Sequence, residues 1–219
     1  MASILLFWLF GLGLSLPGNP QVDDSLTSTV LGLQNRYAAV KGLSADFRQN
    51  YRGPGVDQTE SGHLWMKKPG LMRWEYKVPE EKLFIADGRD TYLYTPADRQ
   101  VLVQPFSAED MHNTPLRFLL GQGEILKSFT ASWEPEFSPK LAGTRIFRLT
   151  PLASEAEYTF LVLECDPANH DLRRLIIREP TGNTSEFYFA NIVTDAKLGK
   201  GQFQFKAPKG TEVIRLDEK

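Results

Sequence analysis

Turn-forming residues divide the chain from residue 43 to residue 106 into short extended runs, and this pattern leaves few folds open. The runs read LSADFRQNY, TESGHLWMK, LMRWEYKV, EKLFIAD, DTYLYT and QVLVQPF. Proline presets the first torsion of a turn, and glycine and aspartate accept its less common torsions. Those residues separate the runs, as Gly53-Pro54-Gly55, Pro69-Gly70, Asp87-Gly88 and Thr95-Pro96. Short strands at intervals of roughly 8 to 12 residues predict an antiparallel meander that becomes a sandwich or a barrel.

Two segments have a helical rather than an extended period. Residues 24–41 predict a helix with one apolar stripe formed by Leu26, Val30, Leu33, Tyr37 and Val40. Residues 114–129 predict two short helices broken at Gly121 and Gly123. Strands then resume as RIFRLTP, YTFLVLECD, DLRRLIIREP, TSEFYFANIVTD, FQFKAP and EVIRL. The chain is therefore predicted to be mainly β, as one strongly curved antiparallel sheet with inserted helices.

The stretch GHLWMKKPGLMRWEY, residues 62–76, predicts a hairpin that turns at Pro69-Gly70. Side chains alternate across a strand, so Leu64 and Met66 share one face and Trp65 lies on the other. On the returning strand Met72 and Trp74 are separated from Leu71 in the same way. In an antiparallel sheet with one face exposed to solvent, apolar and polar residues alternate regularly along each strand. Because neither face of this hairpin is purely polar, we expect apolar contacts on both.

The N-terminus predicts a secretory signal peptide over residues 1–20, followed by a single domain over residues 21–219. Its first charge is Asp23, and the apolar run before it is short for a membrane span. An uncleaved membrane anchor is the alternative. No cysteine follows the apolar run, so we expect no lipid modification there.

Composition and motifs argue against several classes of function. A formal net charge of -2 gives no basic field for nucleic acid. The histidines do not have the spacing of metal ligands, and we predict no metal site and no cofactor. Cys165 lies in the apolar run YTFLVLEC and is predicted to be buried, and Asp87 in ADGRD is predicted to be a turn residue. We therefore predict a protein that is not an enzyme.

Apolar side chains are nevertheless more numerous than a small sheet needs. Methionine adapts to irregular partners and aromatic rings supply large rigid surfaces, a combination suited to a cavity for flexible apolar ligands. The residues concerned are Trp65, Met66, Met72, Trp74, Phe84, Ile85, Tyr92 and Tyr94.

An ordered set of motifs resembles the LolA family of periplasmic carriers, which take lipoproteins from the inner to the outer membrane. The run GHLWMKKPGLMRWE is followed by Pro79, IADG at 85–88, Tyr92 with Tyr94, Gln100 and TPLRFLL at 114–120. The similarity extends from about residue 24 to the end, where Phe203, Phe205, Pro208 and Gly210 match the closing strand and turn. The resemblance implies an unclosed antiparallel β-barrel whose hydrophobic concave face is covered by a helical lid, formed by residues 24–41 and 114–129.

The resemblance also implies roles for individual residues. Leu119 and Leu120 would contact cargo from the lid. Met72 stands where the family usually has phenylalanine, which keeps the position apolar. Lys68 stands in place of an arginine that holds the lid closed, and it lacks the planar guanidinium fork. The acyl-chain cavity would be lined or braced by Leu64, Trp65, Leu71, Met72, Trp74, Ile85 and Tyr92.

The partners implied are lipoprotein cargo, an inner-membrane lipoprotein-releasing ABC transporter and an outer-membrane lipoprotein acceptor, with the protein itself a periplasmic monomer. Three alternatives stay open at this point. A related protein of the same fold could bind another envelope lipid or a glycolipid. A secreted hydrolase could be built on carboxylates that are remote in sequence. An envelope sensing module would be indicated by an uncleaved N-terminal anchor.

Overall fold

The computed structural model describes residues 24–106, 121, 123–153 and 158–216. The predicted signal peptide at 1–20 and the segment holding Leu119 and Leu120 lie outside the described residues. In the first half the elements are α1 (Asp24–Ala39), β1 (Gly42–Gly53), β2 (Val56–Lys67), β3 (Leu71–Val78), β4 (Lys82–Ala86), β5 (Asp90–Thr95) and β6 (Gln100–Pro105). The second half contains α3 (Ile125–Ser128), β7 (Phe129–Trp133), β8 (Arg145–Pro151), β9 (Phe160–Cys165), β10 (Leu172–Arg178), β11 (Thr184–Thr194), η2 (Lys200–Phe203) and β12 (Glu212–Arg215).

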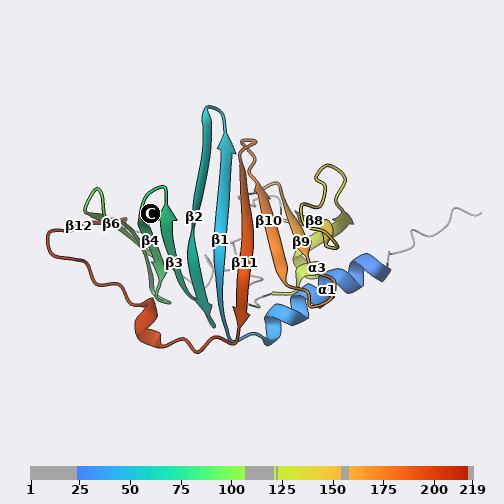
Figure 1. The fold of residues 1–219 in the computed structure, drawn as a ribbon, viewed down its shortest axis with the longest axis horizontal. Helices are drawn as coiled ribbons and strands as arrows, with labels where there is room; N and C mark the ends of the chain where they lie inside the picture. Colours follow the sequence, from blue (N-terminus) through green and yellow to red (C-terminus); the bar gives the residue numbers. More distant parts are fainter. Residues whose placement is uncertain (1–23, 107–120, 122, 154–157, 217–219) are drawn as a thin grey trace, which may run out of the picture.

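All strands of the described chain belong to one open sheet. Its order is β12-β6-β5-β4-β3-β2-β1-β11-β10-β9-β8-β7, so the two halves of the sequence meet where β1 pairs with β11 (Figure 1). Neighbouring strands run antiparallel, as short turns between sequential strands require, except that β12 is parallel to β6. Because β7 and β12 do not pair with each other, the curved sheet is not closed. The predicted mainly β, unclosed antiparallel barrel is confirmed.

The β2–β3 hairpin forms where the sequence predicts it, with Leu64 opposite Trp74 and Met66 opposite Met72. The register is irregular between Ser61 and Gly62, where the two strands approach closely. A Cβ atom on Gly62 would lie 1.8 Å from the backbone oxygen of Glu75, so only glycine fits there.

The sheet has two faces with different coverings. We call the side that carries Leu64 and Met66 the α1 face, because these side chains belong to one buried cluster with Val30 and Leu33 of α1. We call the other side, which carries Trp65 and the residues paired with it, the far face.

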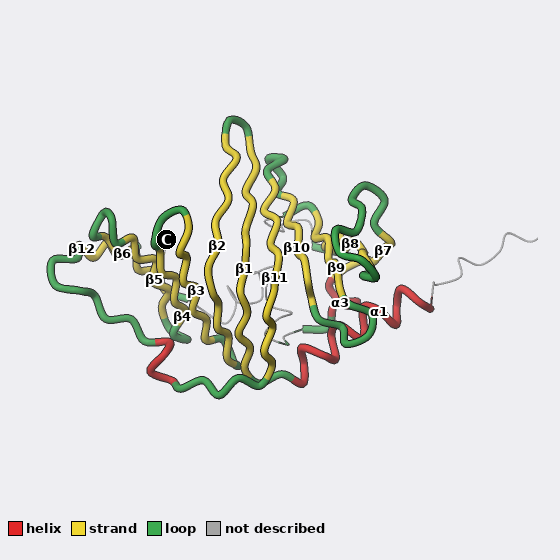
Figure 2. Tube along the Cα trace, in the orientation of Figure 1, coloured by secondary structure: helices red, strands yellow, loops and turns green. Residues whose placement is uncertain are grey.

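The C-terminal segment, residues 195–211, covers part of the far face. It runs as loop and the short helix η2 from the end of β11 to β12 (Figure 2). Phe205 stacks on Tyr92 with ring centroids 5.3 Å apart, and Arg73 Nη1 donates a hydrogen bond to the Gln202 backbone oxygen at 3.2 Å. On the far face the segment thus makes an aromatic contact with β5 and a polar contact with the hairpin, and apolar contacts on both faces of the hairpin stay a prediction.

Several predicted elements differ from the structure. FQFKAP was predicted as a strand, which is wrong: its first part ends η2 and the remainder is irregular, because it packs across the sheet instead of extending its edge. β7 was not predicted, since its residues, FTASW, follow directly on α3 and alternate poorly. Of the predicted helical region 114–129, the described part holds α3, which ends at Ser128.

Candidate functional site

The α1 face is the largest apolar surface that the described elements build. It is formed by alternating residues of neighbouring strands, and residues paired across strands share a face. Phe47 is paired with Phe189, and Met66 with Met72, which places β1, β2, β3 and β11 in one continuous layer. The buried apolar side chains on these strands are Leu43, Ala45, Phe47, Leu64, Met66, Met72, Trp74, Phe187 and Phe189.

Aromatic rings dominate the centre of this layer. Phe47 lies 4.8 Å from Trp74 and 4.9 Å from Tyr76, both edge to face, and Trp74 lies 5.9 Å from Phe187. Such pairs prefer edge-to-face contact because the ring face is negative and the ring edge is positive. Met66 and Met72 lie beside the rings, so rigid and adaptable surfaces are combined.

Helix α1 packs on this layer through the stripe that the sequence predicts. Val30, Leu33, Tyr37 and Val40 are each at most 3% exposed. The Tyr37 hydroxyl accepts a hydrogen bond from the Leu172 backbone nitrogen at 3.0 Å, and its burial raises the pKa of Tyr37. The predicted helix over 24–41 is confirmed, with its end at Ala39.

Lys68 holds the C-terminal end of α1. Its Nζ donates to the backbone oxygen of Tyr37 at 2.9 Å and to that of Ala38 at 2.6 Å. The last carbonyls of a helix have no partner within the helix and carry the negative end of its dipole, so a cation is favoured there. Desolvation lowers the pKa of Lys68, while Asp195 acts in the opposite direction.

Gly121 also lies at this contact. A Cβ atom on it would lie 2.4 Å from Lys68 Nζ and 2.6 Å from the Tyr37 oxygen. Its φ of 62° is in the left-handed region that glycine accepts most easily. The predicted break at Gly121 thus brings the chain against the end of α1.

The rest of α1 is held by a few polar contacts. Arg36 Nε lies 3.1 Å from Asp171 Oδ1, and Arg145 Nη1 donates to Thr29 Oγ1 at 3.1 Å. Gln34 Oε1 accepts from the Ile125 backbone nitrogen at 2.7 Å, which joins α1 to α3. Thr29 and Arg36 lie on one side of the apolar stripe and Gln34 on the other, and these contacts are partly buried.

Little free space is left beneath α1. The gap there has a volume of about 10 Å³, and it is bordered by Tyr37, Leu43, Ala45, Leu64, Leu172, Phe189 and Ile192. That volume is about the space of one water molecule. The helix therefore fills the part of the apolar face around Tyr37 and Leu64, and a larger guest at that place requires α1 to move.

The structure separates the residues predicted to line one cavity into two groups. Leu64, Met72 and Trp74 lie together in the buried layer on the α1 face. Trp65 and Ile85 both pair with Arg73, and Tyr92 pairs with Ile85, so these side chains share the far face. Leu71, paired with Lys67, lies on that face too. Alternation along each strand makes this separation unavoidable for neighbouring residues.

Sequence reasoning did not select Phe47, Phe187 and Phe189 for the site. Phe187 and Phe189 do alternate with polar residues, but β11 is remote in sequence from the hairpin. The pairing of β11 with β1 is visible only in the tertiary structure. The hydrophobic alternation along β11 is the one sequence signal that could have placed Phe187 and Phe189 on its buried face.

The described residues offer few groups for bond-making chemistry. No three His, Cys, Asp or Glu side chains gather as a metal site within the described ranges. Burial raises the pKa of Cys165 to about 11, which disfavours its thiolate, and the predicted burial of this residue is confirmed. Asp87 Oδ1 accepts from the backbone nitrogens of Arg89 and Asp90 at 2.9 Å each, as a turn residue does. Among the described helices, none is both long and apolar enough to cross a membrane.

The fold and the site define a class: an open, curved antiparallel sheet with a helix fastened over its apolar face. Residues 38–206 match the family described as outer membrane lipoprotein carrier protein LolA. The chain belongs to this family.

Relatives match over most of their length. The outer-membrane lipoprotein carrier protein of Chromohalobacter salexigens is 29% identical over 210 residues, covering 95% of this chain and 96% of the relative. That of Neisseria gonorrhoeae is 25% identical, covering 79% and 80% of the two chains. An uncharacterized conserved protein from Thermus thermophilus has a similar fold, with a TM-score of 0.55 at 11% identity, over 88% of this chain and 100% of that one. Mycobacterium tuberculosis lipoprotein LppX has a TM-score of 0.53 at 11% identity, over 81% and 99%.

Proposed function

We propose that this protein is a periplasmic carrier that shelters the acyl chains of lipoproteins on its α1 face during transfer to the outer membrane. The proposal concerns binding and release, without bond making, metal or cofactor. The observation that carries it is a broad apolar sheet face with a helix packed on part of it, whose end is held by two hydrogen bonds from Lys68. Family membership gives the class of cargo.

The chemistry of the α1 face suits flexible hydrocarbon. Met66 and Met72 have unbranched side chains that can rearrange around a guest, while Phe47 and Trp74 are rigid. A site for one rigid ligand would need several polar groups to orient it. The buried layer described above is formed by apolar side chains, which favours an acyl chain over a polar metabolite.

The free energies explain why the cover must be reversible. Each methylene exposed to water costs about 0.8 kcal/mol, so one chain of roughly sixteen carbons costs on the order of 13 kcal/mol. The carrier must offset most of that cost and still bind the chain less tightly than the acceptor does. Repacking of α1 over the empty face supports release, because the closed state regains the contacts of Val30, Leu33 and Tyr37.

We infer that loading displaces α1 from the sheet. The space beneath it, about 10 Å³, cannot admit a hydrocarbon chain while the helix is docked. The Lys68 contacts and the Arg36–Asp171 ion pair are partly exposed, so they can exchange with water at modest cost. Lys68 is the proposed closing residue.

On this basis Leu64, Met72 and Trp74 are proposed to contact the acyl chains. Trp65, Leu71, Ile85 and Tyr92 are proposed to brace the sheet from the far face. Leu119 and Leu120 remain proposed lid contacts from sequence resemblance.

The proposed route has three partners: lipoprotein cargo, an inner-membrane lipoprotein-releasing ABC transporter, and an outer-membrane lipoprotein acceptor. We further propose removal of a signal peptide over residues 1–20 and a monomeric single domain over residues 21–219.

The direct test is release of lipoprotein from membranes. Exported protein is incubated with energised spheroplasts, and whatever leaves the membrane with it is separated by size exclusion and identified by mass spectrometry. We expect a soluble complex that contains lipoprotein. Free lipid in the complex, or no complex, would contradict a lipoprotein carrier.

A further inference from the structure

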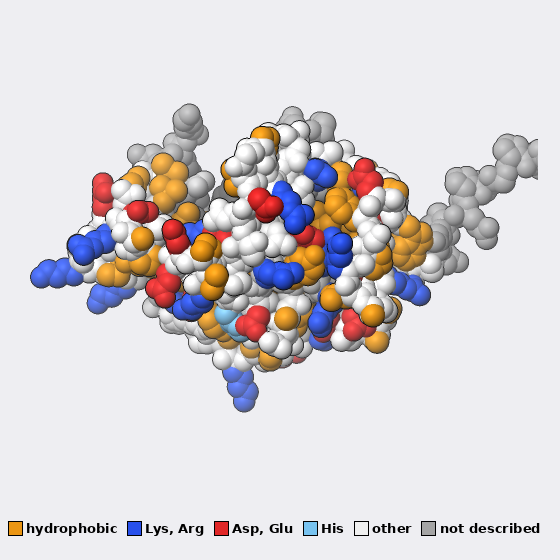
Figure 3. Space-filling view, turned by 45° about the horizontal axis from the view of Figure 1, so that its top comes forward, with side chains coloured by type: hydrophobic (Ala, Val, Ile, Leu, Met, Phe, Trp, Pro, Cys, Tyr) orange, Lys and Arg blue, Asp and Glu red, His pale blue; other side chains and the backbone are white. Residues whose placement is uncertain are grey.

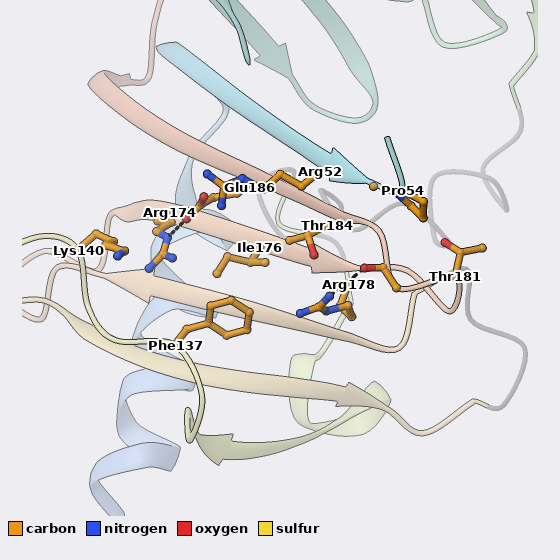
Figure 4. Close-up of a pocket in the computed structure, with 12 residues that line it drawn as sticks. Arg52, Pro54, Phe137, Lys140, Arg174, Ile176, Arg178, Thr181, Thr184 and Glu186 are labelled. Atoms are coloured by element: carbon orange, nitrogen blue, oxygen red, sulfur yellow. Dashed lines mark hydrogen bonds and ion pairs between the residues drawn. The ribbon is translucent and has the colours of Figure 1, made fainter. Parts of the chain in front are cut away.

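A groove on the far face lies away from the α1 face and has no role in the function proposed above. It has a volume of about 590 Å³ and lies between the tip of the β1–β2 hairpin, the β10–β11 turn and the segment 134–144 (Figure 4). Its lining includes Arg52, Pro54, Phe137, Lys140, Ile176 and Arg178.

Part of the floor of the groove is apolar and tightly packed. Ile176 is 1% exposed and packs in a small cluster with Ile146 and Val162. Phe137, from the segment that crosses over the strands, packs against the same cluster. In the close-up, Ile176 and Phe137 lie between the two ends of the groove (Figure 4).

The buried charges at the groove are already paired. Arg174 Nη1 lies 3.0 Å from Glu164 Oε2, and Arg174 Nε lies 2.6 Å from Glu186 Oε1. With both carboxylates bound to one guanidinium, this trio is a structural network and carries a net negative charge. The other cationic side chains of the lining are not part of this network and face solvent.

Those other cations are Arg52, Lys140 and Arg178, and none is tightly paired. The nearest acid to Arg52 is Asp57 at 3.8 Å, and both side chains are more than 60% exposed, where an ion pair contributes little. Arg178 Nη1 donates to the Gly182 backbone oxygen. Within the described residues, the Lys140 side chain has no carboxylate within ion-pair distance.

The distribution of these charges indicates what the groove binds. Lys140 lies toward one end and Arg178 toward the other, with Arg52 on the wall, and between them lie the paired Arg174 and Glu186 as well as Ile176 and Phe137 (Figure 4). A single phosphate group would need cations that converge on one point. An extended chain with several carboxylates and intervening apolar side chains would pair with separated cations and cover the floor.

We propose that this groove docks an acidic, partly apolar peptide segment of a protein partner. The chain as a whole has a formal net charge of -2, so the local excess of cations does not follow from overall composition. In the space-filling view, Lys and Arg side chains gather beside hydrophobic ones on the visible face (Figure 3). Since the groove and the α1 face are on opposite sides of the sheet, a partner can hold the protein there while cargo is bound.

The test uses a short labelled peptide in which aspartate alternates with leucine. Its binding to the exported protein is followed by fluorescence anisotropy at low and physiological salt. We expect saturable binding that weakens as salt rises, and about tenfold weaker binding for Lys140→Glu and for Arg52→Glu. Both side chains are exposed, so the fold is retained. Lys209→Glu, an exposed change remote in sequence, is the matched control and should bind normally.

Amide chemical shifts locate the peptide. Shifts confined to residues around Ile176, Gly182 and Thr184 support the groove, whereas shifts in α1 overturn it. The proposal also fails if the peptide does not bind, or if both charge-reversal variants bind it as tightly as the unchanged protein does.

Phosphatidylglycerol vesicles test a competing source of anions. If they bind through Lys140 and Arg52 while the peptide does not, the groove binds lipid headgroups and the peptide proposal is wrong.

Discussion

At the scale of single residues, position along a strand decides which side of the sheet a ring occupies. Trp65 and Trp74 belong to one hairpin, and both were predicted to serve one cavity. Trp74 pairs with Leu64 on the α1 face, while Trp65 pairs with Arg73 on the far face. Two similar side chains therefore have different surroundings, and this difference can be measured.

Quenching by a brominated fatty acid should distinguish the two tryptophans. In a protein processed to residues 21–219, Trp65→Phe with Trp133→Phe leaves Trp74, and Trp74→Phe with Trp133→Phe leaves Trp65. Bromine quenches only at contact, so we expect strong quenching of Trp74 and little of Trp65. Fluorescence titration measures both. Equal quenching of the two would mean that the chain does not lie on the α1 face.

At the scale of elements, α1 is held by an apolar stripe and by a small number of hydrogen bonds and ion pairs. Lys68→Met removes two hydrogen bonds to the helix end but keeps an apolar stem of similar length. The expected cost to docking of α1 is about 1–2 kcal/mol, or roughly 5- to 30-fold faster exchange of its amide hydrogens. Hydrogen exchange with mass spectrometry of α1 measures it.

Lys68→Arg is the matched control, because guanidinium can also donate to two carbonyls. It should keep slow exchange in α1. Unchanged exchange in Lys68→Met would show that packing alone holds the helix and that Lys68 is not the closing residue.

Strands β9, β10 and β11 are joined on the far face by Glu164, Arg174 and Glu186. Burial by itself would raise the pKa of Glu164, but hydrogen bonds from Thr144, from the Leu141 and Lys140 backbone and from Arg174 outweigh it and lower the pKa. A carboxyl whose folded pKa is below its unfolded value stabilises the fold above that unfolded value, and the contribution is lost as pH falls.

We therefore expect the free energy of unfolding to decrease as pH falls below 4.5, the ordinary value for glutamate. Glu164→Gln should cost about 3 kcal/mol near pH 7, because it leaves Arg174 less well compensated, and should flatten the acid dependence. Urea unfolding at several pH values measures both effects. Glu136→Gln, at a side chain that is 62% exposed, should cost less than about 1 kcal/mol. If Glu164→Gln lowers the free energy of unfolding equally at acid and neutral pH, the Glu164 carboxylate is not the source of the acid dependence.

At the scale of the whole molecule, the sheet is covered on both sides by segments from the two ends of the described chain. Helix α1 packs on one face, and residues 195–211 cross part of the other. The C-terminal segment thus stabilises the strands without occupying the proposed lipid face. A substitution in this segment should therefore change the free energy of unfolding while α1 remains docked on the other face.

Phe203 provides that test, because it is 1% exposed and lies in η2. Phe203→Ala should lower the free energy of unfolding by about 3 kcal/mol, through lost burial and the cavity left behind. Amide exchange in α1, measured under conditions where both proteins are folded, should be unaltered. Val213→Ala, at a side chain that is 50% exposed, should cost far less. If α1 exchange rises in Phe203→Ala, the two faces are coupled.

Local pattern was sufficient for much of this protein. Turn residues between short alternating runs predicted the strands from β1 to β6, and the stripe from Leu26 to Val40 predicted α1, because turn torsions and periodicity are properties of neighbouring residues. The order of the motifs indicated the family and the position of Lys68.

Every relation between distant segments required the tertiary structure. These include the β1–β11 pairing that brings Phe47 to Phe189, the far-face position of Ile85 and Tyr92 under the C-terminal segment, and the charged groove built from three separate turns. Such contacts depend on which surfaces remain to be buried after local structure has formed, and no short stretch of sequence contains that information.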